Sequence, residues 1–221
     1  IVSLYLTHLS KNSKISTLRR RLVSISMVHK LKGHYLDTKH PIIVENLMGI
    51  RRVKGSIQKG KKPILINHLK SIINVINEQK IEDIKKSRDK SIILVGFGGG
   101  FRRTELITID FEDLEFVPEG LKITIKKSKT DQFGEGMIKG LPYFTNEIYC
   151  PVVNLKRWLE ISKIKSGPIF RRFSKGSTLT DKRLTDQSVV LLMKEYLNLA
   201  GIENKNFAGH SLRSGFATVA A

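Results

Sequence analysis

Residues 100–107 read Gly-Phe-Arg-Arg-Thr-Glu-Leu-Ile. Arg102 and Glu105 stand three residues apart, so they share one face if this stretch is helical. The five residues that lead into it, 96–100, are Gly-Phe-Gly-Gly-Gly and carry no dinucleotide-binding fingerprint. These glycines instead favour a sharp turn or a close approach of two backbone segments.

Two further stretches place basic side chains at defined positions. Residues 125–132, Ile-Lys-Lys-Ser-Lys-Thr-Asp-Gln, put Lys129 where a strand runs into a turn. Residues 209–217, Gly-His-Ser-Leu-Arg-Ser-Gly-Phe-Ala, put His210 and Arg213 three apart. Each stretch alone has an ordinary explanation, such as an exposed ion pair, a solvated lysine or a helix cap, because such features are common and contribute little.

Taken together and in this order, the three stretches resemble the tyrosine recombinase or phage integrase family of site-specific DNA recombinases. The stretches around Glu105 and His210 are the specific part, whereas the sequence around the turn at Lys129 varies within the family. The resemblance extends to residues 16–25 (Ser-Thr-Leu-Arg-Arg-Arg-Leu-Val-Ser-Ile) and on to 49–52 (Gly-Ile-Arg-Arg), so it covers nearly the whole chain.

The resemblance assigns roles by motif. It implies four catalytic positions: Arg102, Lys129, His210 and Arg213. Glu105 would support the arginines. Arg103 is a rival for the first arginine, but Arg102 is preferred because it stands three residues before Glu105, as in the family pattern.

The reaction that the family implies is a transesterification at a DNA phosphodiester. A tyrosine oxygen attacks phosphorus, the 5′-hydroxyl leaves, and the DNA stays attached as a 3′-phosphotyrosine. The resemblance implies no cofactor and no metal, so arginines would stabilise the charge on the phosphate oxygens and the lysine would be the general acid. Removing one such donor in comparable sites costs roughly 3–4 kcal/mol of barrier.

The nucleophile has no candidate in this chain. In the family, a further His or Trp and then the Tyr follow the His-x-x-Arg motif, but only eight residues, 214–221, follow Arg213 here. All five tyrosines precede His210. We expect a chain truncated at both ends, since it lacks an initial Met and ends in a helical-looking run. An incomplete sequence ranks above a degraded gene and above a tyrosine supplied in trans.

The charge balance favours a polyanionic partner. Lys and Arg number 39 and Asp and Glu 20, so the formal net charge is 39 − 20 = +19. Double-stranded DNA is the expected partner, with a homotetramer on DNA for the full-length protein, although a merely lysine-rich soluble protein would also be basic. The candidate DNA-binding residues are Arg19, Arg20, Arg21, Arg51, Arg52, Lys54, Lys61 and Lys62.

Other classes of site find little support. A single cysteine, Cys150, excludes an internal disulfide and suits a reducing, cytoplasmic setting. The six histidines form no His-Glu-x-x-His pair, so no metal site is expected. Residues 55–62 nearly match a phosphate-binding loop but end in Lys62 where Ser or Thr must stand, which favours a basic hinge.

The expected fold is mainly α with a small antiparallel β-sheet, an α+β class. We predict a helical core-binding, DNA-binding domain at 1–58, a basic linker at 59–64 and a catalytic domain at 65–221. In the first domain, one helix should place Leu18, Leu22, Ile25 and Val28 inward, with Ser16 or Thr17 as its cap and Gly33 beyond its end, and another should follow Pro41.

In the second domain, apolar periodicity predicts helices at 65–76, 151–162 and 185–200 and strands at 114–117, 121–125 and 137–142. The apolar run 91–97 fits helix or strand by periodicity, and the resemblance favours helix.

Two functions of different classes remain: a recombinase that cuts and rejoins DNA as the full-length protein, or a non-catalytic DNA-binding remnant or regulator. A type IB topoisomerase shares the chemistry, but the helical first domain and the stretch at 209–217 argue against it.

Overall fold

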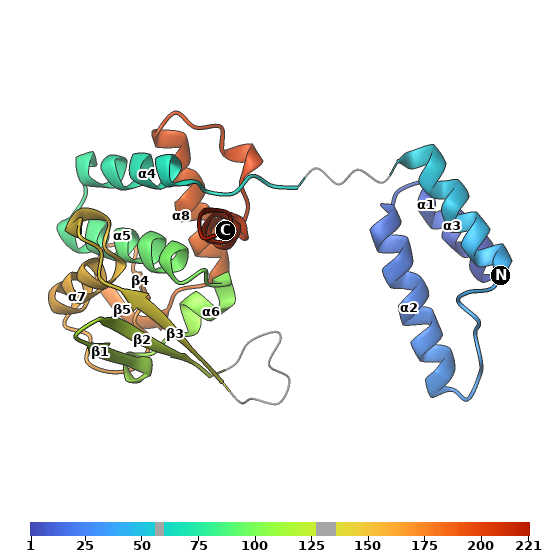
Figure 1. Cartoon of the computed structure of the whole chain (residues 1–221), viewed down its shortest axis with the longest axis horizontal. Coiled ribbons are helices and arrows are strands. Elements are labelled where there is room, and N and C mark those ends of the chain that lie inside the picture. The colour runs from blue at the N-terminus through green and yellow to red at the C-terminus, as the bar shows by residue number, and fades with distance from the viewer. Residues whose placement is uncertain (56–59, 127–135) are drawn as a thin grey trace. The chain divides into compact units, whose positions relative to one another are not determined.

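The computed structural model describes residues 1–55, 60–126 and 136–221 (Figure 1). The chain divides into two compact units, Ile1–Gly60 and Lys61–Ala221, each described here by itself. The division falls within the 59–64 segment expected to be a linker, while residues 56–59 lie outside the described residues.

The first unit packs three helices, α1 (Val2–Ser10), α2 (Ile15–Leu31) and α3 (Pro41–Lys54). Pro41 opens α3 because its fixed φ and missing N–H suit the first helical position. The unit encloses one small apolar core, formed by Leu6, Leu18, Leu22, Ile43 and Ile50.

Two details of α2 differ from expectation. Val28 is 57% exposed, whereas it was expected to point inward. The buried residues of this helix, Leu18 and Leu22, lie in its first half, so its last turns extend beyond the core. The helix also begins earlier than predicted. Lys14 is its N-cap and makes no side-chain cap hydrogen bond, so neither Ser16 nor Thr17 caps it.

The second unit is built around α5 (Asp83–Gly98), whose residues 91–97 are all buried. Figure 1 shows this helix in the middle of the unit, where α4 (Ile66–Glu78), α7 (Pro151–Ser162), α8 (Asp186–Leu199) and α9 (Ser211–Val219) pack on it. A helix that is apolar around its whole circumference is stable only when covered on all sides. This explains why periodicity could not identify the run 91–97, which is helical as the resemblance predicted.

A three-stranded antiparallel sheet joins β1 (Leu114–Val117), β2 (Gly120–Ile125) and β3 (Met137–Pro142) in that order. Alternate residues of β2 are buried, as expected for a strand with one face on the core. Ile123 pairs with Lys139 and Ile125 with Met137, so β2 and β3 lead into and out of residues 127–135. Lys129 belongs to that segment and lies outside the described residues. Helices and this sheet confirm the predicted α+β class.

A second hairpin, β4 (Arg171–Phe173) with β5 (Leu179–Arg183), is absent from the prediction. Its strands are short and rich in charged residues, so they carry no alternating apolar signal. Single 3₁₀ turns connect other elements: η1 (Phe111–Asp113), η2 (Glu147–Tyr149) and η3 (Asn204–Asn206).

The chain that enters the second unit lies along the turn before α9. The Lys62 amide donates to the carbonyl of Asn206 (2.7 Å) and the Ile64 amide to that of Ser211 (2.9 Å). Gly215 permits this approach, because a Cβ there would lie 1.9 Å from the Ile64 carbonyl oxygen. The entering segment therefore fixes the position of α9.

Replacing Gly215 with Ala should lower the free energy of unfolding by about 1–3 kcal/mol, since the methyl group forces backbone apart. A decrease in stability would identify the close approach, because a Gly to Ala change inside an uncrowded helix instead stabilises by up to about 1 kcal/mol. Gly140→Ala is the control, as a Cβ there meets nothing within 4 Å. Urea unfolding measures both, and equal midpoints would contradict the close approach.

Candidate active site around Glu105

The turn after α5 delivers Arg102 to the start of α6 (Arg103–Thr108). Gly100 has φ +52°, a left-handed conformation that favours glycine, and a Cβ there would lie 2.7 Å from the Phe216 ring. A Cβ on Gly96 would similarly contact Leu106 at 3.0 Å. The glycine-rich stretch therefore makes both the sharp turn and the close approaches that its sequence predicted.

Glu105 is the buried centre of this region, with 2% of its surface exposed. Its carboxylate accepts a hydrogen bond from the backbone amide of Arg102 (3.0 Å) and another from the Arg102 guanidinium (2.5 Å). A carboxylate in the first turn of a helix caps free amides and complements the helix dipole. The three-residue spacing seen in the sequence thus corresponds to a direct ion pair.

Arg213 reaches the same centre from α9. Its Nη1 donates to the carbonyl of Gly100 (2.8 Å) and lies 4.0 Å from Glu105 Oε2. The Arg213 side chain is 41% exposed and that of Arg102 21%. Two guanidinium groups from distant parts of the chain therefore share one buried carboxylate and both remain accessible to solvent.

Arg103 diverges from this cluster. Its guanidinium lies 3.6 Å from the carboxylate of Asp186, on α8. The side chain passes over Gly209, where a Cβ would meet Arg103 Nε at 2.2 Å. The geometry therefore favours Arg102 over Arg103 as the partner of Glu105.

The two remaining predicted catalytic residues are placed less fully. His210 is exposed at the N-cap of α9, and its ring has no hydrogen-bond partner within the part of the chain that the structure describes. Lys129 is outside that part. The structure thus brings together Arg102, Glu105 and Arg213. The catalytic roles of all five residues stay predictions.

Lys139 on β3 is a member of the cluster that sequence reasoning missed. Its Nζ donates to the carbonyls of Gly99 (2.9 Å) and Gly100 (3.3 Å) and lies 3.6 Å from Glu105 Oε2. It also stands 4.4 Å from the centre of the Phe101 ring, a cation–π arrangement.

Burial lowers the pKa of Lys139, although the negative charge of Glu105 opposes this, and the nearby Arg213 lowers it further. The sequence held one signal for its inward position. Lys139 and Leu141 stand two residues apart on the predicted strand 137–142, and alternate residues of a strand point to the same face. Only the register with β2 shows which face that is.

The strand β2, which pairs with β3, also has a lysine–carboxylate contact at its end. Lys126, directly after β2, lies 2.8 Å from the Asp113 carboxylate and 3.5 Å from that of Asp110. The hydrogen bond to Asp113 is the main reason that the pKa of Lys126 is raised. Lysine–carboxylate contacts therefore hold both strands, at Lys126 directly after β2 and at Lys139 within β3.

The candidate DNA-binding residues are all exposed. Two of them have partners within the protein: Lys54 donates to the carbonyl of Lys11 (3.2 Å), and Lys61 donates to that of Lys205. These two ammonium groups would share their hydrogen bonds with any DNA phosphate.

The three tyrosines of the second unit are engaged elsewhere. Tyr196 is 3% exposed and donates to Asp89 (2.7 Å), and burial followed by the Asp89 charge raises the pKa of its hydroxyl. Tyr143 accepts from Lys156, and Tyr149 bonds to Asn74. None of these interactions involves a residue of the Glu105 cluster.

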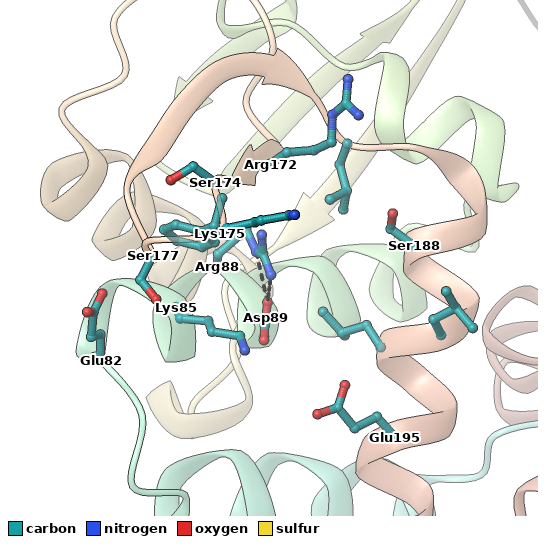
Figure 2. Close-up of a pocket in the computed structure, with 14 residues that line it drawn as sticks. Glu82, Lys85, Arg88, Asp89, Arg172, Ser174, Lys175, Ser177, Ser188 and Glu195 are labelled. Atoms are coloured by element: carbon teal, nitrogen blue, oxygen red, sulfur yellow. Dashed lines mark hydrogen bonds and ion pairs between the residues drawn. The ribbon is translucent and has the colours of Figure 1, made fainter.

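Asp89 also binds Arg88, and this buried pair lies at a polar pocket between α5, α8 and the β4–β5 hairpin (Figure 2). The pocket has a volume of about 510 Å³. Figure 2 shows Lys85 and Lys175 beside Arg88. It also shows Glu195, which lies on α8. None of the residues that line it belongs to the Glu105 cluster, so it is a separate feature.

Among residues 1–55, 60–126 and 136–221, no helix has the length and apolar character needed to cross a membrane. No group of three or more His, Cys, Asp and Glu side chains there could hold a metal ion.

The chain belongs to the phage integrase family, whose model matches residues 64–220. It is 40% identical over 220 residues to the integrase/recombinase XerD homologue of Selenomonas ruminantium. That match covers 98% of this chain and 64% of the relative, so the chain spans somewhat less than two thirds of the relative's length. The predicted family is confirmed.

Solved structures share the fold. The XerH site-specific recombinase in a post-cleavage complex with palindromic difH substrate matches with a TM-score of 0.70 and 16% identity, covering 99% of this chain and 60% of that one. A lambda integrase tetramer bound to a Holliday junction matches with a TM-score of 0.58 and 13% identity, covering 98% and 57%.

Glu105→Gln should lower the free energy of unfolding by about 2 kcal/mol, because Arg102, Arg213 and Lys139 lose the negative charge of Glu105 and one of its two acceptor oxygens. Glu115→Gln is the matched control. Glu115 is 65% exposed and pairs with Lys122, so its change should stay within about 0.5 kcal/mol. Urea unfolding of both variants measures the difference, and equal effects would show that the buried carboxylate does not organise the cluster.

Proposed function

We propose that the full-length protein is a site-specific tyrosine recombinase, which integrates or excises DNA by cutting and rejoining strands through a 3′-phosphotyrosine. The observation that carries this proposal is the convergence of Arg102 and Arg213 on Glu105. Membership of the phage integrase family supports it.

The proposed chemistry follows from the guanidinium groups. Each is permanently charged and planar and can donate two parallel hydrogen bonds to a phosphate. Held by one carboxylate, Arg102 and Arg213 would bind the non-bridging oxygens, where negative charge accumulates in the transition state. Because Glu105 orients both beforehand, little reorganisation would accompany the reaction.

The other roles rest on the family pattern. Lys129 would protonate the leaving 5′-oxygen as general acid, and His210 would hydrogen-bond the phosphate or assist proton transfer. Glu105 would touch no DNA and would position the arginines.

The first unit would serve DNA binding. We propose that residues 1–58 form the core-binding domain, that 59–64 form a basic linker, and that 65–221 belong to the catalytic domain. Exposed arginines on α2 and α3 would contact phosphates, which contribute affinity but little sequence information. The full-length protein would act as a homotetramer on double-stranded DNA in the cytoplasm of a prokaryotic cell.

A second function is a DNA-binding module without cleavage, favoured by the engagement of Tyr143, Tyr149 and Tyr196 with partners outside the Glu105 cluster. The coding sequence downstream of Ala221 separates the two. A Gly-Trp or Gly-His stretch followed by a tyrosine supports the recombinase. A stop codon directly after Ala221 contradicts cleavage by this chain.

Arg102→Ala and Arg213→Ala should each abolish covalent attachment to DNA in a protein expressed with its downstream coding sequence. Binding of duplex should persist, with affinity reduced by no more than about tenfold, because most affinity comes from other phosphate contacts. Trapping of protein–DNA adducts on denaturing gels measures the first effect, and fluorescence anisotropy the second. Arg103→Ala is the control, since Arg103 pairs with Asp186. Normal adduct yield from either cluster variant would refute the assignment.

Duplex binding by this chain should weaken steeply with salt. A protein that neutralises six or more phosphates loses roughly a thousandfold in affinity between 50 and 200 mM salt. Anisotropy titrations across that range measure the slope. A flat response would mean that the +19 charge does not serve DNA binding.

A further inference from the structure

Lys139 and Arg213 compete for the same two acceptors. The carbonyl oxygen of Gly100 receives hydrogen bonds from Lys139 Nζ (3.3 Å) and Arg213 Nη1 (2.8 Å). Glu105 Oε2 lies 3.6 Å from Lys139 Nζ and 4.0 Å from Arg213 Nη1. The lysine approaches from β3 and the arginine from α9, so two elements contact one carbonyl and one carboxylate.

Among the described residues, the charged groups of this cluster are mostly positive. Glu105 contributes one negative charge, while Arg102, Arg213 and Lys139 contribute three positive charges. The Lys139 side chain is only 14% exposed, and desolvation disfavours its charged form. A neutral residue could fill the same space at a lower cost in free energy, because it would not lose hydration of a charge. The presence of a charged lysine therefore indicates that its charge orders the neighbouring groups.

We propose that Lys139 is a positioning residue for Arg213. By standing closer to Glu105 Oε2 than Arg213 does, the ammonium stops the guanidinium, which already donates to the Gly100 carbonyl, from closing onto this carboxylate oxygen as well. The other donors of Arg213 then stay directed to a DNA phosphate. This role rests on the proposed function, in which Arg213 binds the phosphate.

The alternative role for Lys139 is to cap the C-terminal end of α5 and nothing more. Lys139 donates to carbonyls at the C-terminal end of α5, where helices leave carbonyls without intrahelical partners. A residue that only capped α5 would affect stability, and its loss would weaken DNA binding independently of Arg213. The two roles therefore differ in their coupling to Arg213.

A double-mutant cycle on this chain separates them. The affinity for a duplex of about 30 base pairs is measured for the wild type, Lys139→Met, Arg213→Ala and the double variant. We expect Lys139→Met to weaken binding by roughly fivefold to tenfold, the size of one typical net hydrogen bond and no more than the loss caused by Arg213→Ala. In the Arg213→Ala background the same change should have no further effect.

Lys122→Met on the neighbouring strand is the matched control. Lys122 is 48% exposed and pairs with Glu115, so its loss should change affinity less than twofold. Lys139→Arg should restore most of the binding, since it keeps a charged donor at this position. The NMR signal of the Arg213 side-chain N–H should move in Lys139→Met and stay unchanged in Lys122→Met.

Additive losses in the cycle, or an unmoved Arg213 signal, would overturn the proposal. If Lys139→Met does not fold, Lys139→Gln keeps donors for the carbonyls without the charge and is used in the same cycle. A wild-type chain that fails to bind duplex would instead contradict the proposed function. The NMR comparison would still test Lys139 in that case, because it needs no DNA.

Discussion

The second unit depends on one buried negative charge. Glu105 is almost fully enclosed, and an isolated carboxylate in such surroundings would be strongly destabilising. Arg102, Arg213 and Lys139 compensate it from a helix cap, a distant helix and a strand. The need to satisfy this group therefore fixes α6, α9 and β3 relative to each other, and the positive excess left over faces solvent through the two arginines.

Charge in this protein has two separate tasks. The overall excess of +19 is spread over exposed side chains and suits attraction to a polyanion. The cluster around Glu105 holds only a small part of it, but in a defined geometry. Composition alone could suggest that the exposed positive charge attracts a nucleic acid. Only the order of the sequence motifs could indicate the cluster around Glu105.

Local features could be predicted from the sequence and distant ones could not. The Arg102–Glu105 pair follows from a spacing of three, and the strands 114–117 and 137–142 follow from short runs of strand-forming residues between turns. Arg213 bonds to Gly100 across 113 residues of chain, and only family resemblance joined them beforehand. Lys139 was missed because its side depends on strand register. Val28 was misplaced because periodicity does not say where a neighbouring helix ends.

The backbone bonds from Lys62 and Ile64 to the turn before α9 have a mechanical consequence. The segment that enters the second unit is tied directly to Asn206 in η3 and to Ser211, the first residue of α9, which lies between His210 and Arg213. Tension applied to the chain near Lys61 would therefore reach α9 through backbone hydrogen bonds and the tight contact at Gly215, with no flexible side chain between. The helix that carries Arg213 is thus coupled directly to a pull from the N-terminal side.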